Sequence, residues 1–358
     1  MITISLCMIV RNEEDTLARC LNSIKDVVDE IIIVDTGSSD NTKEIAKTFT
    51  DKIMDFQWID DFSAARNYAF QQATQDYILW LDADDVLLDA DQIKFIHLKK
   101  ELDPSVDIVM MKYNTGFDEK GNVTFSYYRE RLSRRCGNYK WCEPIHEYLQ
   151  IAGKIINVDI AITHKKIHPV QQGRNIKIYE KMISQGKELS PRGLYYYARE
   201  LKDNDRIEDA IEYFHQFLQT KKGWVEDNIN ACHTLSKCYE KCNMIENILP
   251  ILFKSFEYDL PRGEICCEIG YYFKRQGDHH RAIFWFELAT KLKKPENTWG
   301  FIMHDYWDYI PYMELCTCYY AIKRIDKSLE YHQKAEHIKP DSPQVVYNRQ
   351  FFKKNLNI

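Results

Sequence analysis

A run of five apolar residues at 77–81 (Tyr-Ile-Leu-Trp-Leu) ends abruptly in the acidic segment 82–85 (Asp-Ala-Asp-Asp). A short, continuous apolar run predicts a strand that is buried on both faces of a parallel sheet. Apolar runs at 2–10 and 30–34 also end in charged residues, and segments with helical spacing of apolar positions separate the runs. This alternation predicts an α/β domain with a doubly wound sheet.

The pattern changes after residue 170, where strand-like runs stop and helical periodicity takes over. Small residues recur there at intervals of 38, 34 and 46, at Ala198, Ser236, Gly270 and Cys316. The middle interval is the tetratricopeptide period, and the last exceeds it by an insertion of 12 residues. We therefore predict an α/β domain at 1–170 and an all-α, tetratricopeptide-like repeat domain at 171–358.

The insertion at 297–309 is rich in aromatic side chains, namely Trp299, Phe301, Tyr306 and Trp307. Aromatic residues in a loop are harder to explain as core than those at repeat positions, and they are common at contact surfaces. We expect Trp299 and Trp307 to contact a bound sugar or peptide. The alternative is a contact with a second subunit, which would make the protein a homodimer through its repeats.

Composition describes an ordinary globular protein, with 45% hydrophobic and 28% charged residues among 358. The net charge of −6 argues against nucleic acid as a partner. No apolar run approaches the roughly 20 residues that a membrane span requires. The eleven cysteines include no Cys-x-x-Cys pair; a zinc site at Cys232, Cys238 and Cys242 is the weaker alternative to buried thiols in helices. Reduced thiols and the lack of an export signal predict a cytoplasmic protein.

The acidic segment 82–85 carries the first candidate chemistry. Open α/β sheets bind ligands at the carboxyl ends of their strands, and Asp-x-Asp at such a place can hold a hard divalent cation. The alternative is a polar turn or helix cap. The role of Asp85 stays unassigned, with a helix cap as its alternative. The chain has no Gly-x-Gly-x-x-Gly fingerprint and no phosphate-binding P-loop. Any phosphates must therefore be neutralised by a cation and by basic side chains such as Arg11 and Arg66.

Four motifs occur in one order and spacing: Ile4–Glu14, Val34–Thr42, Asp61–Asn67 (Asp-Phe-Ser-Ala-Ala-Arg-Asn) and Leu81–Asp85. Together they resemble the family-2 inverting glycosyltransferases of the GT-A fold. The branch that has the third motif and a helical-repeat tail includes bacterial peptide glycosyltransferases that modify glycocins such as sublancin. The resemblance covers about the first 170 residues closely and the remainder as an architecture.

The resemblance implies roles for donor-side residues. Val10, Arg11, Glu13 and Asp35 would hold the nucleotide base and ribose of a UDP-sugar, with Arg66 near the base or diphosphate. Asp82 would contact the ribose or a metal-bound water, and Asp84 would be the main ligand of Mg²⁺ or Mn²⁺. His164 would be a late metal ligand, with His168 as its competitor. The alternatives are a helix-dipole partner for Glu13, an Asx turn for Asp35 and a backbone-satisfied His164.

A cluster of four arginines lies at 129–135. Guanidinium groups suit bidentate recognition of a diphosphate, and Arg131 and Arg134 match the family's Arg-x-x-Arg best. The alternative is a solvated strand face or ion pairs with Glu119 and Glu130.

The segment 140–149 resembles the Trp…His-Glu segment of the same branch. Inverting transfer needs a carboxylate that takes the acceptor's proton, and we assign this role to Glu147, with His146 positioning it or touching the diphosphate. Glu143 is the fallback for the base, and Trp141 is an acceptor contact.

These observations predict a metal-dependent enzyme that moves a sugar of the glucose or N-acetylglucosamine type from a UDP-sugar to a peptide or protein side chain, Ser/Thr or Cys. One alternative is an acceptor glycan or lipid-linked acceptor of the cell envelope. Another is a repeat-based binding module with a relic catalytic domain. The sequence leaves the sugar, O- against S-transfer, the acceptor and the oligomeric state open.

Overall fold

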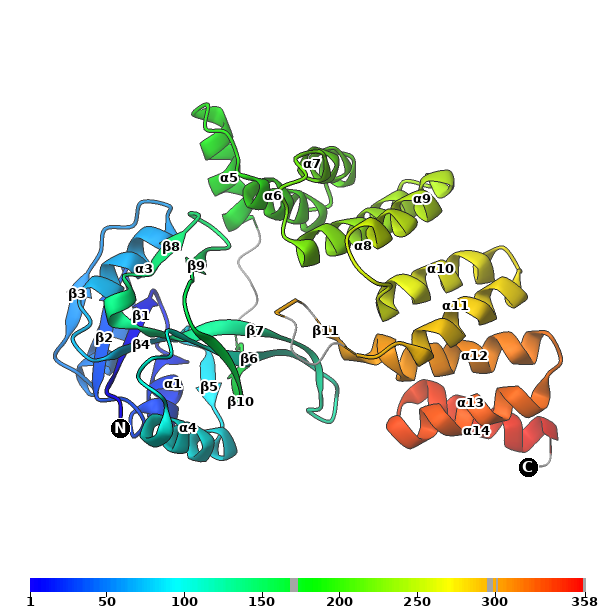
Figure 1. The fold of residues 1–358 in the computed structure, drawn as a ribbon, viewed down its shortest axis with the longest axis horizontal. Coiled ribbons are helices and arrows are strands. Elements are labelled where there is room, and N and C mark those ends of the chain that lie inside the picture. The colour runs from blue at the N-terminus through cyan, green and yellow to red at the C-terminus, as the bar shows by residue number, and fades with distance from the viewer. Residues whose placement is uncertain (168–172, 295–298, 301, 357–358) are drawn as a thin grey trace. The chain divides into compact units, whose positions relative to one another are not determined.

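The computed structural model describes residues 1–167, 173–294, 299–300 and 302–356 (Figure 1). The chain divides into two compact units, Met1–Gly186 with Asn297–Phe301, and Lys187–Glu296 with Ile302–Ile358. Helix α5 (Arg174–Ser184) belongs to the first unit. The predicted division at residues 170 and 171 and the competing ligand His168 lie outside the described residues, as does Phe301.

The first unit is built on a mixed sheet with the strand order β3-β2-β1-β4-β7-β6-β10-β5. The strands are β1 (Ile4–Val10), β2 (Glu30–Asp35), β3 (Ile53–Asp55), β4 (Tyr77–Trp80), β5 (Asp85–Leu87), β6 (Ile108–Phe117), β7 (Val123–Arg134) and β10 (Ile155–His164). The first four are mutually parallel, as their apolar runs predict, whereas β7 is antiparallel to both β4 and β6. A separate ribbon joins β8 (Lys140–Cys142) to β9 (Tyr148–Gln150).

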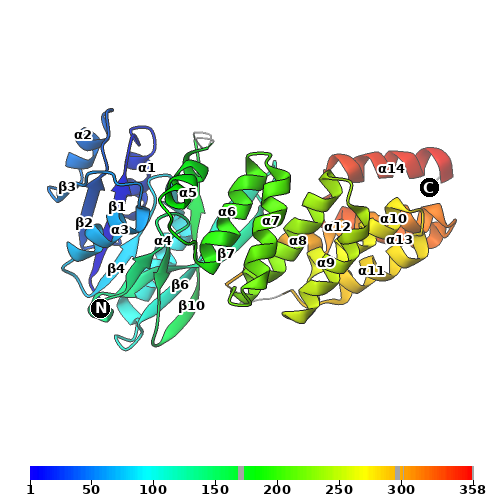
Figure 2. The same ribbon diagram turned by 90° about the horizontal axis from the view of Figure 1, so that it is seen from above.

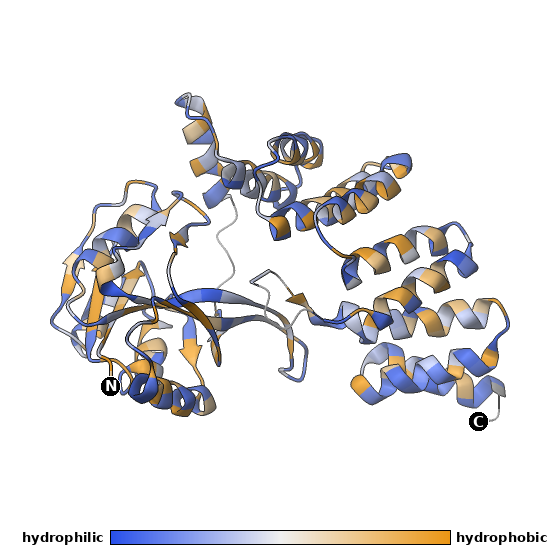
Figure 3. Cartoon of the chain, viewed as in Figure 1, coloured by the Kyte–Doolittle hydropathy of each residue, from blue (hydrophilic) through white to orange (hydrophobic). Residues whose placement is uncertain are grey.

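Both faces of this sheet are covered, and Figure 3 shows hydrophobic stretches in orange on its strands, alternating with hydrophilic ones on the longest strands. The helices are α1 (Leu17–Ile24), α2 (Thr42–Lys47), α3 (Phe62–Gln71) and α4 (Asp89–Glu101). Residues of α1, α2 and α4 form one core with alternate residues of β1. Residues of α3 and the β8–β9 ribbon form the core on the other face, around Trp80 and Trp141. The predicted doubly wound α/β architecture is confirmed.

The second unit consists of stacked helices, which lie side by side along the array in Figure 2. They are α6 (Pro191–Asp203), α7 (Ile207–Gln219), α8 (Val225–Lys241), α9 (Ile248–Lys254), α10 (Gly263–Arg275), α11 (His279–Lys291), α12 (Tyr309–Ala321), α13 (Ile325–Ile338) and α14 (Pro343–Leu356). A Cβ atom at Gly270 of α10 would lie 2.8 Å from the Phe286 ring of α11, so the small residue allows the two helices to approach. Cys232 and Cys238 are buried in α8, and burial raises the pKa of both thiols, which favours core over a zinc site.

The aromatic insertion contributes Trp307 to the core of the second unit. Trp307, predicted to contact an acceptor, is instead buried; it packs against Gly263, where a Cβ atom would lie 3.2 Å from its ring.

Among the helices that the structure describes, none combines the length and the apolar character that a membrane crossing requires.

Glu30 at the start of β2 is a buried carboxylate that ties three segments together. It accepts hydrogen bonds from Ser5 and Lys52, and from the backbone and hydroxyl of Thr74 at 2.9 and 2.8 Å. Burial alone would raise the pKa of Glu30, but these donors outweigh it and lower the pKa from 4.5 to about 2. Because the folded-state pKa lies below the unfolded value, Glu30 contributes stability above pH 4.5 that is lost as pH falls towards 2.

Glu30→Gln should therefore lower the free energy of unfolding at pH 7 by about 1.5–3 kcal/mol, because charge-assisted hydrogen bonds are lost. The loss of stability on acidification below pH 4.5 should also be shallower than in the unchanged protein. Urea denaturation at several pH values measures both. The exposed Glu44 supplies the control, since Glu44→Gln should change stability by no more than about 0.5 kcal/mol. Equal stability of Glu30→Gln and the unchanged protein at pH 7 would contradict the prediction.

Candidate active site

The carboxyl ends of β1 and β2 are joined by a network of side-chain hydrogen bonds. Val10 and Asp35 are register partners, so the loops that follow them start side by side. Asn12 has a φ of +55°, which Asn tolerates better than most residues. Its Oδ1 accepts from the backbone of Ser39 at 2.8 Å, and Glu14 accepts from the backbone of Asn41 at 3.0 Å. The two loops are therefore held as one surface at this edge of the sheet.

Asp35 uses its two carboxylate oxygens differently. Oδ1 accepts from the backbone N–H groups of Gly37 and Ser38 at 2.7 and 2.8 Å, which is the Asx turn that we gave as its alternative role. Oδ2 is buried and has no hydrogen-bond partner among the described residues. A buried acceptor without a partner is costly, so Oδ2 is available to a donor group of a ligand.

Val10 is the register partner of Asp35, and Glu13 lies in the loop that follows β1; both already form hydrogen bonds. Glu13 Oε2 accepts from the Thr16 hydroxyl at 2.6 Å, and the Glu13 backbone N–H donates to Thr42 at 2.7 Å. The carbonyl of Val10 accepts from the backbone N–H of Thr36 at 3.0 Å. Arg11, next in the chain, is exposed.

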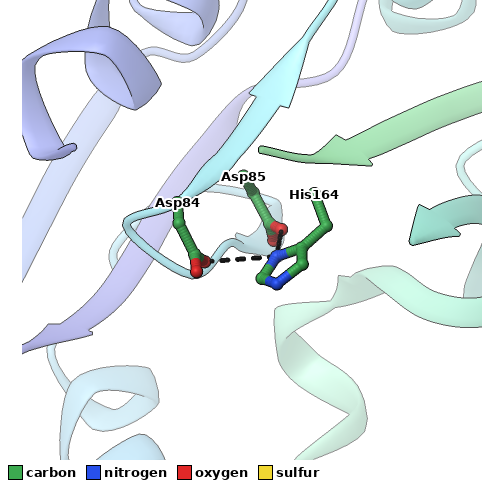
Figure 4. Close-up of side chains that lie close together, drawn as sticks. All are labelled: Asp84, Asp85 and His164. Atoms are coloured by element: carbon green, nitrogen blue, oxygen red, sulfur yellow. Dashed lines mark ion pairs between the residues drawn. The ribbon is translucent and has the colours of Figure 1, made fainter. Parts of the chain in front are cut away.

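Three side chains that could together hold a metal ion lie near the carboxyl end of β4. Asp84, Asp85 and His164 each offer one ligand atom, and these atoms lie within 4.8 Å of one another (Figure 4). His164 stands opposite Asp85 where β10 pairs with β5, so strand pairing brings together residues 79 positions apart. Its Nδ1 lies 3.3 Å from Asp84 Oδ1 and 3.5 Å from Asp85 Oδ1.

The electrostatics of this group fit a cation. Burial alone would lower the pKa of His164, but its contacts with the carboxylates of Asp84 and Asp85 outweigh it and raise the pKa to about 9. The site therefore stabilises positive charge, and His164 must release its proton before its imidazole can ligate a metal ion. Asp85 Oδ1 is buried, and its distance of 3.5 Å from His164 Nδ1 is too long for a normal hydrogen bond. Carboxylate oxygens and an imidazole are ligands that Mg²⁺ or Mn²⁺ sites use.

Arg66 connects this edge to the segment 143–147. Its Nη2 donates to Asp82 Oδ1 at 2.7 Å, and its Nε donates to Glu147 Oε1 at 2.7 Å. Burial alone would raise the pKa of Asp82, but the positive charges of Arg66 and Arg131 outweigh it and lower the pKa to about 2. Asp82 and Glu147, which lie 65 positions apart, thus share one guanidinium.

Comparison with protein families decides what this domain is, because the model described as "Glycosyl transferase family 2" matches residues 5–150, the part that contains all of these groups except His164. Residues 5–150 form a family-2 glycosyltransferase domain. A tetratricopeptide-repeat model also matches residues 263–295.

Curated relatives of this chain differ in how much of it they align with. A TPR repeat-containing protein of Synechococcus elongatus is 42% identical over 41% of this chain and 35% of its own length. The SPbeta prophage-derived glycosyltransferase SunS of Bacillus subtilis is 29% identical over 82% of this chain and 70% of its own length. An uncharacterized glycosyltransferase of Rickettsia typhi is 37% identical over 26% of this chain and 32% of its own length. The chain thus spans about a third of the cyanobacterial and rickettsial relatives.

Asp85 is the residue of the glycosyltransferase domain that sequence reasoning undervalued. It does not cap a helix, since Leu88 precedes α4 and Asp85 begins β5. Its carboxylate is fully buried and forms an ion pair of 3.0 Å with Arg131. Its Oδ2 also accepts from the backbone N–H of Asp82 at 3.0 Å, which closes the acidic turn. The third acid of Asp-Ala-Asp-Asp was the available signal.

The two arginines expected to bind a diphosphate are engaged elsewhere. Arg131 is fully buried, with its guanidinium 3.9 Å from the ring centre of Trp80, so it faces the core of the glycosyltransferase domain and cannot reach a ligand in this conformation. Arg134 is the register partner of Tyr77 at the start of β4 and pairs with Asp107 at 2.5 Å. It therefore lies at the opposite end of the strand from the acidic turn.

The aromatic acceptor candidates of this unit are also placed. Trp141 is 3% exposed and packs edge-on against Trp80, with ring centres 4.9 Å apart, so it is a core residue and not an exposed contact. Trp299 is 37% exposed, and its indole N–H donates to Asn157 Oδ1 at 3.1 Å. Part of the Trp299 ring is therefore accessible.

The segment that carries the proposed base has an unusual backbone. Glu143 and His146 have φ angles of +70° and +51°, a region in which side chains other than Gly are uncommon. Such conformations persist only where surrounding contacts hold them, and they cluster at functional sites. One such contact is the bond from the Phe62 backbone N–H to the Pro144 carbonyl at 2.8 Å.

Proposed function

We propose that this protein is a metal-dependent inverting glycosyltransferase that moves a sugar from a UDP-sugar to a side chain of a peptide or protein. The observation that carries the proposal is the joining of Glu147 to Asp82 through Arg66, beside the group Asp84, Asp85 and His164. In one site, Asp84, Asp85 and His164 would hold a cation for the donor, and the carboxylate of Glu147 would serve the acceptor. The family match of residues 5–150 supports the reaction class.

On the donor side, Asp35 Oδ2 would accept a hydrogen bond from the nucleotide base, and Glu13 and Arg11 would border the same pocket. Asp82 would contact the ribose. Asp84 and His164, with Asp85 behind them, would hold Mg²⁺ or Mn²⁺. When bound, the cation supplies positive charge that stabilises a departing nucleoside diphosphate.

On the acceptor side, Glu147 would act as general base. The acceptor oxygen or sulfur forms a bond to the anomeric carbon, and the bond from that carbon to the diphosphate oxygen breaks with its electron pair on UDP. The acceptor proton passes to Glu147 Oε2, because Oε1 accepts from Arg66. Attack on the face opposite the leaving group inverts the configuration at the anomeric carbon.

We propose a peptide or protein acceptor, with a Ser, Thr or Cys side chain as the attacking group. The acceptor class rests on the resemblance of the motifs to the peptide glycosyltransferases. The alignment with the glycosyltransferase SunS, which extends over 82% of this chain, supports a sugar-transfer enzyme that includes both the catalytic domain and repeats. The stacked helices α6–α14 would bind the acceptor chain, because tetratricopeptide-like arrays offer extended surfaces. A homodimer through the repeats and a cytoplasmic location stay predictions.

The test is a panel of UDP-sugars, read by UDP release with and without Mn²⁺, followed by intact-mass analysis of peptides encoded beside the gene. We expect cation-dependent UDP release for one donor and a mass increase of one sugar residue on a peptide. Release of UDP without transfer to any peptide, but with transfer to a glycan, would overturn the acceptor assignment. No UDP binding and no turnover would overturn the enzyme assignment.

Asp35→Ala should weaken UDP binding about 10–100-fold, because the buried oxygen that we assign to the base is removed. Isothermal titration calorimetry with UDP measures this loss. Because Oδ1 also shapes the turn at Gly37, Asp35→Asn is the companion variant, as it retains an oxygen for the turn. Asp40→Asn, in the same loop but bonded to Thr42 and Glu14, is the control and should leave UDP affinity within about threefold. Unchanged affinity of Asp35→Ala would refute the role.

A further inference from the structure

Arg66 is held in a single position by aromatic rings as well as by its two carboxylate partners. Its guanidinium carbon lies 4.8 Å from the ring centre of Trp80 and 4.9 Å from that of Trp141, and the residue is 7% exposed. Burial alone would lower the pKa of Arg66, but the charges of Asp82 and Glu147 outweigh it and keep the group cationic. A planar, immobilised fork can fix the separation of two carboxylates, which the single point charge of lysine cannot do.

The neighbours of Arg66 on α3 grip the same acceptor-side segment. The Asn67 side chain donates to the carbonyl of Trp141 at 2.9 Å and accepts from its N–H at 2.9 Å. Phe62, in the first turn, bonds Pro144 through its backbone. Asp61 caps this helix by accepting from the Ala64 N–H at 2.9 Å. The Asp61–Asn67 motif therefore acts as a scaffold for residues 141–147, and its arginine bonds protein carboxylates.

We propose that Arg66 is the positioning residue that sets Glu147 relative to Asp82, so that the acceptor side and the donor side of the site keep one geometry. This inference rests on the proposed function, because it assigns the base to Glu147. Misplacement of a reacting group by about 1 Å can cost about 100-fold in rate. A guanidinium that bonds one carboxylate of each side couples the two placements directly.

The test compares Arg66→Gln, Arg66→Lys, Glu147→Gln and the double variant Arg66→Gln/Glu147→Gln in the full-length chain. Arg66→Gln should lower kcat for sugar transfer about 100-fold while UDP affinity, measured by calorimetry, stays within about fivefold. Arg66→Lys should lose about tenfold, because lysine keeps the charge without the fork. The double variant should be no more than about threefold slower than Glu147→Gln alone, because both changes disable one unit.

The matched control is Lys94→Gln in the first unit, since Lys94 also joins two carboxylates, Asp91 at 3.4 Å and Asp159 at 3.0 Å. It should leave kcat within about twofold. An unchanged kcat in Arg66→Gln, or losses that multiply in the double variant, would overturn the positioning role of Arg66 and leave the proposed function standing. If Arg66→Gln fails to fold, as shown by its melting temperature, the same cycle with Arg66→Lys decides. Unchanged protein without any turnover would overturn the proposed function and this inference with it.

Discussion

Replacing Glu147 by glutamine should lower the rate of sugar transfer by about 10²–10⁴-fold, the range that a general base contributes. The amide is nearly isosteric and can still accept a hydrogen bond from Arg66, so the segment 143–147 should stay in place. It cannot take up the acceptor's proton. The loss should appear in kcat, measured by peptide mass shift, while UDP affinity changes little.

Glu143→Gln is the informative companion, because Glu143 belongs to the same segment as Glu147. Like His146, Glu143 has a left-handed backbone conformation. We expect this variant to retain most of its activity. Loss in Glu143→Gln with full activity in Glu147→Gln would transfer the role of base to Glu143. Full activity of both variants would contradict a carboxylate base in this segment.

Asp84→Ala should lower cation-dependent UDP release about 10³-fold, because the donor diphosphate loses its main source of compensating charge. The fold should survive, because Asp84 is partly exposed and, among the described residues, alanine loses only the side-chain contact with His164 at 3.3 Å. Alanine retains the backbone carbonyl that accepts from the Lys165 N–H at 2.9 Å. Calorimetric titration of Mn²⁺ in the presence of UDP gives a second readout that does not depend on turnover. In the unchanged protein, EDTA should abolish activity and Mn²⁺ should restore it.

Asp89→Asn is the control for charge in the same region, because Asp89 is exposed in the first turn of α4. It should leave Mn²⁺ binding and UDP release within about twofold. Turnover that persists in EDTA, or Mn²⁺ affinity that Asp84→Ala does not change, would remove the metal from the proposed reaction.

The parallel part of the sheet could be predicted because its signal is local. Each of the first strands is a continuous apolar run that ends in charged residues, and parallel strands put those ends on one edge. The placement of Asp35 and Asp82 at this edge could therefore be predicted from the sequence and the fold rule together. The repeat helices were similarly visible through small residues such as Gly270, whose position is set by a neighbouring ring.

What the sequence could not show depends on antiparallel pairing between distant segments. The short strand β5 places Asp85 opposite His164, and no local pattern encodes that register. The pairing of β7 with β4 turns Arg131 inward and carries Arg134 to the far end. In each case a side chain of the expected type is present, and tertiary pairing decides whether it reaches the site.

The buried pair of Asp85 and Arg131 has a consequence for how the site meets its ligand. Three carboxylates in one short turn repel one another. Here the sheet supplies an internal counter-ion, so the acidic turn is preorganised before binding. Ligand binding then costs little reorganisation, and affinity reflects the contacts themselves. Arg131 does not reach the ligand side of the site, but its ion pair with Asp85 helps to hold the acidic turn in its binding conformation.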